Sequence, residues 1–412
     1  MTFRPLFGSA RRMRIGIDGG CLSNRRGFGR FSRELLRALA QRVDPARHQV
    51  SVFVDRPSLA LVEVPAPFQT VAVDVREAPS RAASAEGRRK LGDLFAMGHA
   101  VSRSRLNLMY FPASYSFFPV WNVSKVVTTL HDTLALAHPE LVFNRWRGKL
   151  AWKAKEHAAV AWSDRIVTVS ESARRDLIAW FRLDPARVTA ITEGPDAIFS
   201  PRPSGESAEV LRRFGLNPAK RYVLYVGGLS PHKNLIRLIE AFRSVVPEDV
   251  PLVLVGDFGD VFQTHVPQLR EAVARHGLER RVLFTGYVDD PDLAHLYSRA
   301  YALVQPSLME GFGLPAVEAM ACGTPVISST AGSLPEVVGD AGVFFNPLDV
   351  SEMAAKLNGL LADPRERSRL AKLAKARAAS FSWDRAAGLL LDIFEDLAGD
   401  GAEQDGRARA SA

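Results

Sequence analysis

The sequence predicts an α/β protein made of two doubly wound, Rossmann-like domains. Apolar runs of strand length alternate with helical patterns along the 412 residues, which is typical of parallel sheets covered by helices. The alternation occurs in two series, and a stretch rich in proline and glycine at residues 194–203 separates them. Glycine-rich turns follow several predicted strands, at the edge where open α/β sheets bind ligands.

The first series begins at the predicted strand 14–18. A glycine-containing loop follows at residues 19–29, and then an amphipathic helix with apolar residues at 31, 35, 36 and 39. Residues 106–124 are uncharged but contain two prolines and several polar side chains, so they indicate a strand and an aromatic loop rather than a membrane span. Further strands are predicted at 50–54, 125–130, 165–170 and 188–191, helices at 31–42 and 171–181, and a polar, basic loop at 78–92.

The second series repeats the pattern with strands about 20 to 30 residues apart. Its last helix begins after Ser382, which is a plausible N-cap, and extends to about residue 397. Its strands are predicted at 222–226, 252–255, 282–285, 301–305, 326–328 and 343–345.

Charge is distributed unevenly along the chain. Residues 1–200 hold 30 Lys and Arg against 18 Asp and Glu, a net +12, whereas the remainder holds 23 against 27, a net −4. The basic half indicates an anionic partner, and without a recognised nucleic-acid motif we expect an anionic membrane surface rather than nucleic acid. A basic composition with no such partner is the alternative. The two cysteines predict neither a disulfide framework nor a metal cluster, which fits a reducing, cytoplasmic compartment.

The most informative motif spans residues 306–325. Glu310 and Glu318 lie eight residues apart, and between them the turn Gly311-Phe312-Gly313 leads into a helix at Leu314. Glycines let backbone N–H groups approach phosphate oxygens, and a helix N-terminus favours anions. Glu318, one turn into the helix, can accept hydrogen bonds from ribose hydroxyls, and Glu310 can reach a sugar beyond the phosphates. The alternative is a structural turn with two solvated glutamates.

This Glu-x7-Glu block, with its GFGLP and GTPVI flanks, resembles that of the retaining glycosyltransferases of family 4, which have the GT-B fold. The resemblance extends over nearly the whole chain. It implies an acceptor domain at 1–200 and a nucleotide-sugar donor domain at 201–380, facing each other across a cleft. It also implies a helix at 381–398 that returns to the first domain, and residues 399–412 are expected to form a disordered tail.

Two further elements resemble phosphate-binding parts of that family. Gly227 and Gly228 precede Lys233, which is expected to open a helix and to neutralise a diphosphate, although a plain surface lysine is the alternative. Gly228 stands where many members have an arginine, and His232 stands at the arginine of a GTxxPRKN-like variant. Candidates for the second cation are therefore Arg25, Arg26 and Arg30, in a loop with Gly27 and Gly29 that resembles the family's GIGRY loop or is an ordinary turn.

Two more positions resemble sugar- and base-contacting parts of the family. His131, with Asp132 beside it, matches an element whose histidine contacts the transferred sugar, and Tyr287 and Val288 match a base-binding loop. Structural roles are the alternative for both. The Asp-Pro-Asp run at residues 290–292 reads as a helix start rather than a metal motif. Aromatic residues at 117, 118 and 121 could contact a lipid or pack in the core.

The resemblance implies a retaining transfer of a sugar from a nucleoside diphosphate to a cell-envelope glycan or lipid-linked acceptor. The expected catalytic residues are His131, Glu310 and Lys233. No metal or cofactor is expected, because Lys233 and backbone dipoles hold the leaving group. GDP-mannose is favoured over a UDP-sugar, and the enzyme is expected in the cytoplasm, peripheral on the inner face of the plasma membrane. A sugar-nucleotide epimerase and a non-catalytic sugar-nucleotide-binding subunit are the alternatives.

Overall fold

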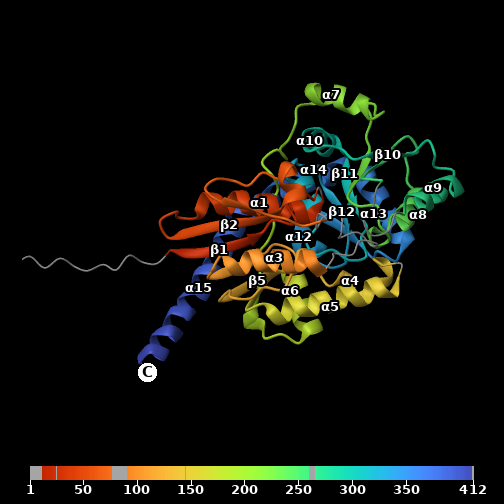
Figure 1. Ribbon diagram of the computed structural model, residues 1–412. Helices are drawn as coiled ribbons and strands as arrows, with labels where there is room; N and C mark the ends of the chain where they lie inside the picture. Colours follow the sequence, from red (N-terminus) through yellow and green to blue (C-terminus); the bar gives the residue numbers. More distant parts are fainter. Residues whose placement is uncertain (1–11, 25, 77–90, 144, 259–264, 411–412) are drawn as a thin grey trace, which may run out of the picture.

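The computed structural model describes residues 12–24, 26–76, 91–143, 145–258 and 265–410, with side chains described up to residue 399. It contains a seven-stranded and a six-stranded parallel sheet (Figure 1). Helices cover both sheets, so the predicted pair of doubly wound, Rossmann-like domains is confirmed. Arg25 and residues 78–90 of the predicted basic loop lie outside the described residues.

The first sheet has the strand order β3-β2-β1-β4-β5-β6-β7. The inner strand β1 pairs in parallel with β2 and β4, so Ile15 lies beside Val50 and Leu108 in the apolar core. The strands are β1 (Met13–Asp18), β2 (His48–Asp55), β3 (Gln69–Val73), β4 (Leu108–Phe111), β5 (Lys125–Thr129), β6 (Arg165–Thr168) and β7 (Val188–Ala190). The helices are α1 (Gly27–Arg42), α3 (Leu91–Arg103), α4 (Leu134–Ala137), α5 (Trp146–Trp162) and α6 (Glu171–Phe181).

The second sheet has the order β10-β9-β8-β11-β12-β13, with β8 and β11 at the point where the order reverses. Ligands bind at such switch points in open α/β sheets. The strands are β8 (Val223–Val226), β9 (Leu252–Val255), β10 (Val282–Gly286), β11 (Ala302–Gln305), β12 (Val326–Ser329) and β13 (Gly342–Phe345). The helices are α7 (Ser204–Arg213), α8 (Leu235–Phe242), α9 (Val266–Arg275), α10 (Asp290–Arg299), α11 (Leu314–Ala321), α12 (Leu334–Val338), α13 (Val350–Ala362), α14 (Pro364–Ala378) and α15 (Trp383–Ala410).

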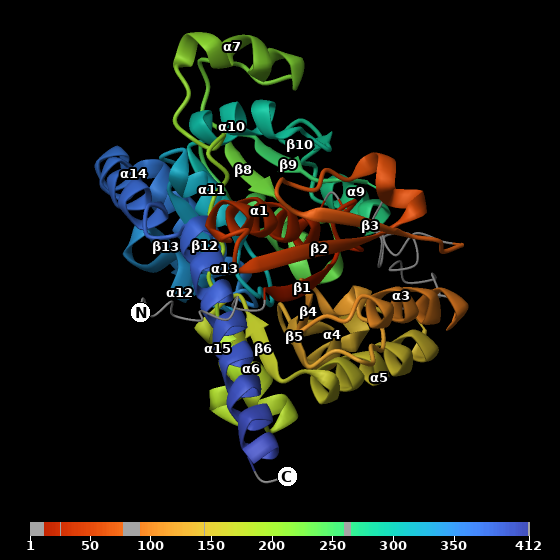
Figure 2. The same ribbon diagram turned by 60° about the vertical axis from the view of Figure 1, so that its left-hand side comes forward.

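Helix α15 crosses from the second domain back to the first, where it lies against α1 (Figure 2). Arg42 of α1 forms a double hydrogen bond with Asp384, and Phe394 packs on Tyr110 of β4 with ring centroids 5.5 Å apart. The return of this helix was expected from the resemblance. The helix continues to Ala410, so residues 399–410 differ from the predicted disordered tail.

Two other expectations need correction. Helix α1 begins at Gly27 rather than Phe31, so Gly27, Gly29 and Arg30 lie in its first turn and not in a loop. The helix can begin this early because the preceding loop packs on it, and a β-carbon at position 29 would clash with the carbonyl of Asn24. Lys233 ends a 3-10 turn, Pro231–Lys233, and does not open α8.

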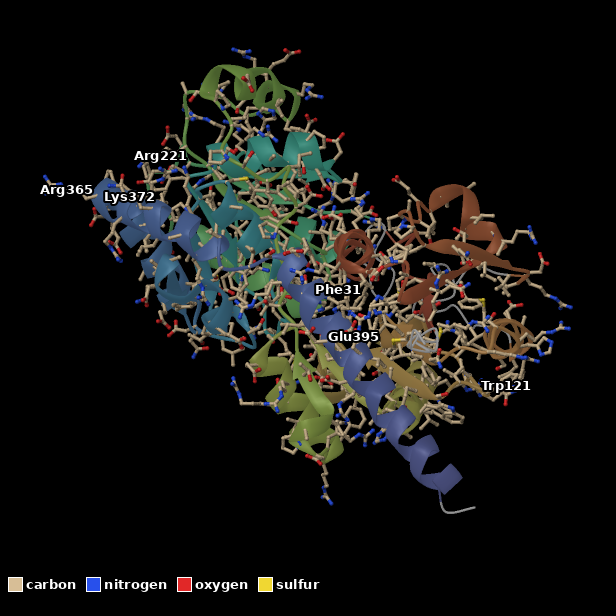
Figure 3. The ribbon with its side chains drawn as sticks, turned by 90° about the vertical axis from the view of Figure 1, so that its left-hand side faces the viewer. Phe31, Trp121, Arg221, Arg365, Lys372 and Glu395 are labelled. Carbon is tan, nitrogen blue, oxygen red and sulfur yellow. The ribbon has the colours of Figure 1, made fainter. Side chains whose placement is uncertain are left out.

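Residues 106–124 form β4, a short 3-10 turn and an aromatic loop, as predicted. Phe117 and Phe118 are buried against Phe111, whereas Trp121 lies at the outer surface of the first domain (Figure 3). In the described part of the chain, no helix combines the length and the apolar character needed to cross a bilayer.

Candidate functional site

The predicted residues of both domains meet where the carboxyl ends of the two sets of parallel strands face each other. Ser170, the N-cap of α6, donates a 2.6 Å hydrogen bond from Oγ to the carbonyl of Gly311. Gly311 also lies against His131, so closely that a β-carbon at position 311 would clash with the His131 carbonyl. The Glu-x7-Glu block of the second domain is therefore in direct contact with the first domain.

The glycine turn of this block is built around Gly313. Its φ of +103° is accessible to glycine and rarely to other residues, and it lets the chain enter α11 directly after the turn. The Ser333 hydroxyl donates to the carbonyls of Glu310 (3.1 Å) and Phe312 (2.7 Å), which holds the turn in place. The predicted helix start at Leu314 is confirmed, and Glu318 lies one turn into α11.

Glu310 forms a buried ion pair with Lys233. The Lys233 ammonium lies 2.6 Å from Oε1, which also accepts hydrogen bonds from Ser307 (2.8 Å) and Gln305 (3.2 Å). Burial alone would raise the pKa of Glu310, but Lys233 outweighs it and the pKa lies below its ordinary value. The two sequence-predicted residues therefore form one charged unit, with Glu310 ionised at neutral pH.

Glu318 pairs with a residue of the other domain. Arg30 donates a hydrogen bond from Nη1 to Oε1 of Glu318 at 2.8 Å and also contacts Asp290. Its guanidinium group lies 5.2 Å from the ring centroid of Phe199. The Tyr297 hydroxyl donates to Oε2 at 2.9 Å. Burial raises the pKa of Glu318 to about 7, although Arg30 opposes the shift. Both carboxylate oxygens are therefore engaged by protein donors.

His131 lies at the end of β5 between two aromatic rings. The rings of Phe28 and Phe31 stand edge-on to the imidazole at centroid distances of 4.8 and 4.6 Å. The Nε2 atom lies 3.1 Å from the carbonyl of Pro112, and burial lowers the pKa of the imidazole to about 4. His131 is therefore neutral at physiological pH, and one of its nitrogens is occupied by the protein.

Asp132, the neighbour of His131, accepts a 2.8 Å hydrogen bond from the backbone N–H of Leu134. Burial raises its pKa above the ordinary value, and the nearby Glu310 adds to this shift. The carboxyl group thus stabilises the start of α4 while it lies close to the Glu310–Lys233 pair.

The loop between β8 and α8 presents Lys233. Gly227 has a φ of +154°, and the Tyr225 hydroxyl donates to the Gly228 carbonyl at 2.6 Å. Asn234 follows in a left-handed conformation, with its amide donating to two proline carbonyls. His232 is partly buried, and desolvation together with the nearby Lys233 lowers its pKa to about 3, so it carries no charge at neutral pH. His232 therefore cannot supply the second cation.

The predicted base-binding loop follows β10 at the same edge of the sheet. Tyr287 is 55% exposed and Val288 is buried, and Gly286 lies against the Phe258 ring. None of the hydrogen bonds or ion pairs among the described residues joins Tyr287 to the two glutamates.

The Asp-Pro-Asp run begins α10 as predicted, with Asp289 as its N-cap. In the described part of the chain, no group of three or more His, Cys, Asp and Glu side chains is arranged to hold a metal ion.

Three residues at this interface were not predicted. Asp290 and Tyr297 contact the Arg30–Glu318 pair, and Glu193 lies with Oε1 3.9 Å from Nδ1 of His131. Glu193 comes three residues after the last residue of β7, so the rule that ligands bind at strand carboxyl ends could have identified it. The other two depend on tertiary contacts that the sequence pattern does not reveal.

Two family models match the chain and together account for most of it. The model described as "Glycosyltransferase Family 4" matches residues 25–199, and the model described as "Glycosyl transferases group 1" matches residues 207–377. The first match ends and the second begins between the last strand of the first sheet, β7, and the first strand of the second, β8. Each model therefore corresponds to one of the two domains.

Named relatives and solved structures agree with these matches. The O-antigen chain mannosyltransferase B of Escherichia coli is 32% identical over 286 residues, which are 68% of this chain and 73% of that protein. The D-inositol 3-phosphate glycosyltransferase of Salinispora tropica is 35% identical over 287 residues, 66% of this chain and 59% of that protein. The Anabaena protein HepE, solved in complex with UDP-glucose, has a TM-score of 0.70 at 22% identity and covers 93% of this chain and 100% of its own.

Proposed function

We propose that this protein transfers mannose from GDP-mannose with retention of configuration. The proposal starts from its family, because the chain belongs to the family 4 glycosyltransferases and is a hexosyltransferase of GT-B fold. The acceptor in this proposal is a cell-envelope glycan or a lipid-linked precursor of one. The observation that carries the proposal is the pair of cation–carboxylate contacts, Lys233–Glu310 and Arg30–Glu318, at the facing strand ends. A nucleoside diphosphate sugar has matching parts, since its diphosphate binds cations and its hydroxyls bind carboxylates.

Glu318 would bind the ribose of the donor. In the structure its Oε1 accepts from Arg30 and its Oε2 from Tyr297. Ribose hydroxyls are hydrogen-bond donors, so a bound nucleotide would take the place of Arg30 at Oε1. Arg30 would then be released close to the phosphates, where an arginine binds oxygens in a bidentate manner.

Lys233, Arg30 and the first turn of α11 would hold the diphosphate. Many family members supply a second cation at the position of Gly228, and His232 is neutral here because desolvation and the nearby Lys233 lower its pKa. Arg30 is therefore our candidate for that second charge, and it would come from the opposite domain. Such an arrangement places positive charge on the leaving group only when the two domains are closed.

Glu310, His131 and Asp132 would surround the transferred sugar. The ionised Glu310 would accept hydrogen bonds from sugar hydroxyls once the diphosphate has attracted Lys233. Catalysis would be mainly electrostatic, through stabilisation of the departing diphosphate and of an oxocarbenium-like centre. The acceptor hydroxyl would attack from the face that the diphosphate leaves, which retains the configuration. No metal or cofactor is part of this proposal.

The choice of mannose follows the relatives. The O-antigen chain mannosyltransferase B and the serotype-specific mannosyltransferase WbdA, both of Escherichia coli, are named for transfer of this sugar. The structural neighbour bound to UDP-glucose is 22% identical, so its ligand does not decide the donor of this chain. The relatives described above are named as transferases, which does not favour an epimerase or a non-catalytic subunit.

We also propose that the enzyme works at an anionic membrane surface and that α5 contacts it. Trp146 (67% exposed) and Leu150 (60% exposed) lie one turn apart at the start of this helix, with Arg147 and Lys153 exposed beside them. The one acidic residue of α5, Glu156, is buried and bonded to Ser114. Helices with apolar and cationic exposed side chains bind at lipid interfaces. In Figures 1 and 2, α5 lies along the margin of the first domain.

The donor is tested by thermal unfolding with GDP, UDP, ADP and their common sugar conjugates. A ligand at 100 times its dissociation constant adds roughly 2.7 kcal/mol of stability. We expect the largest rise in melting temperature with GDP-mannose and its loss in Glu318→Ala. The exposed Glu240→Ala in α8 is the matched control and should keep the full rise.

A rise with a UDP-sugar alone would replace mannose in the proposal, and no rise with any nucleotide would overturn the donor site. The anomeric configuration of the product, measured by NMR with a simple mannoside acceptor, tests retention. An inverted product would contradict the attack from the leaving-group face.

A further inference from the structure

Glu193 is a buried carboxyl group that the proposed mechanism does not use. Glu193 is 6% exposed, and it follows β7 at the edge of the sheet where the two domains meet. Backbone contacts fix its position on both sides: the Ile191 N–H donates to the Thr168 carbonyl at 2.8 Å, and Gly194 packs on the backbone of Ser382 and Trp383. The side chain therefore extends from a rigid part of the first domain.

No hydrogen bond to the Glu193 carboxyl group is found in the described part of the structure. Its Oε1 lies 3.9 Å from Nδ1 of His131, which is too long for a hydrogen bond. The carboxyl oxygens are not among the fully buried, unpartnered side-chain atoms of the described residues, so they remain accessible to a ligand. Hydrogen-bonding capacity left open at a substrate interface indicates a contact with the substrate.

The groups around Glu193 favour its protonated form. Glu318 and Glu310 of the second domain are close enough to repel a carboxylate at this position, and only Arg30 opposes them. Burial is the largest influence, and together these effects raise the pKa of Glu193 to about 8. At neutral pH the side chain is therefore mostly a carboxylic acid with an O–H to donate.

The contacts of His131 agree with a protonated Glu193. A carbonyl oxygen only accepts, so the contact of Nε2 with Pro112 requires that Nε2 carries the proton. The imidazole is neutral, and Nδ1 therefore presents a lone pair toward Glu193. A lone pair is repelled by a carboxylate and attracted by a carboxylic acid. The geometry thus fits a protonated Glu193.

We propose that Glu193 is a third functional glutamate of the site, whose carboxylic acid donates a hydrogen bond to a hydroxyl of the transferred sugar. The inference rests on the proposed function, because it places the sugar between His131 and Glu310. Glu193 stays protonated in this role, and no proton is transferred. A carboxylic acid that also accepts through its carbonyl would help to orient the sugar for attack.

The consequence is a specific dependence on pH. The donor O–H is present below pH 8 and is lost as pH rises through the raised pKa, so turnover should fall above about pH 8. Glutamine keeps an N–H donor and a carbonyl at the same positions without titrating. Glu193→Gln should therefore remain active at pH 7 and lack this alkaline decrease.

The experiment compares Glu193→Gln, Glu193→Ala and the exposed control Glu279→Gln. Transfer from the donor identified above is measured from pH 6 to 9.5, and GDP binding is measured by thermal shift. We expect Glu193→Ala to lower turnover roughly 10-fold or more while the shift with GDP is unchanged, since one hydrogen bond to the sugar is lost. Glu193→Gln should stay within about threefold of the wild type at pH 7.

Unchanged turnover in Glu193→Ala would overturn the inference, as would a Glu193→Gln variant as inactive as alanine despite normal binding of GDP. In both cases the proposed function would stand, because the wild type would still bind GDP and transfer sugar. A wild type that binds no nucleotide would instead overturn the proposed function.

Protonation of Glu193 can be tested without any substrate. The folded protein holds a proton that the unfolded chain releases above its ordinary pKa, so wild-type stability should decrease between about pH 4.5 and 8. Glu193→Gln lacks this contribution, and its melting temperature should therefore rise relative to wild type across this range. Parallel curves for the two proteins would contradict a protonated Glu193.

Discussion

At the scale of single residues, the candidate site is held together by opposite charges. Lys233 and Glu310 lie 2.6 Å apart with side chains 17% and 11% exposed. Removing one member of such a pair leaves the other charge buried, and breaking buried pairs commonly costs about 3–5 kcal/mol. The pair therefore keeps each group ionised and oriented until a diphosphate offers Lys233 a second anionic partner.

Lys233→Ala should lower turnover by about 100-fold or more, because the charge that stabilises the departing diphosphate is lost. Steady-state kinetics with GDP-mannose measures this effect. Lys372→Ala on the outer face of α14 is the control, and Figure 3 places this residue far from the domain interface. Wild-type turnover in Lys233→Ala would remove this lysine from the mechanism.

At the scale of helices and strands, the sequence predicted buried elements better than exposed ones. β9 was predicted with its bounds because all four of its residues are apolar and buried. β3 was missed because it is an edge strand, with two exposed residues at its start and an apolar run of only three residues. The start of α1 was placed too late because its two glycines are poor helix formers, whereas packing against Asn24 decides the local structure.

In the candidate site, residues of local motifs could be predicted, whereas contacts between distant parts of the chain could not. Glu310, Glu318 and Lys233 could be predicted because they belong to local motifs. The partner of Glu318 could not, since Arg30 is 288 residues away in sequence and only the folded domains bring them together. The lack of a hydrogen-bond partner for the Glu193 carboxyl group in the described structure likewise depends on the residues that pack around it, and no local sequence pattern describes them.

Helix α5 supports a prediction at this scale. Trp146→Ala combined with Leu150→Ala should weaken binding to vesicles containing anionic phospholipid by about 10-fold or more, because two large apolar side chains no longer enter the interface. Co-sedimentation with vesicles of defined composition measures the partition coefficient. Leu61→Ala combined with Leu348→Ala is the control, since these side chains are equally exposed on other elements. Equal weakening in both proteins would argue against a role for α5.

At the scale of the whole molecule, the structure is closed, with residues of one domain capping those of the other. Glu336 of α12 accepts hydrogen bonds from the first N–H groups of α6, at 2.9 Å from both Glu171 and Ser172. Ser170 and Arg30 add contacts to Gly311 and Glu318. The contacts of Ser170 and Arg30 involve residues of the proposed donor site, so the interface that joins the two domains also assembles that site.

Gly311→Ala should prevent full closure, because the added methyl group meets the His131 carbonyl. We expect a larger radius of gyration by small-angle scattering and roughly 100-fold lower turnover, since small displacements of reacting groups are costly. Gly359→Ala in α13 is the matched control, as a β-carbon there meets no atom within 4 Å. Unchanged scattering and turnover in Gly311→Ala would contradict the role of this contact.

The return of α15 has a consequence for biosynthesis. Ala386, Leu390 and Phe394 belong to the same core as Leu36, Leu39 and Tyr110, which the ribosome makes several hundred residues earlier. The nascent first domain can form most of its sheet, yet the groove beside α1 stays open until the last helix emerges. A variant lacking α15 would therefore expose an apolar surface and be a target for chaperones and proteases, so synthesis of this helix is itself a requirement for a stable first domain.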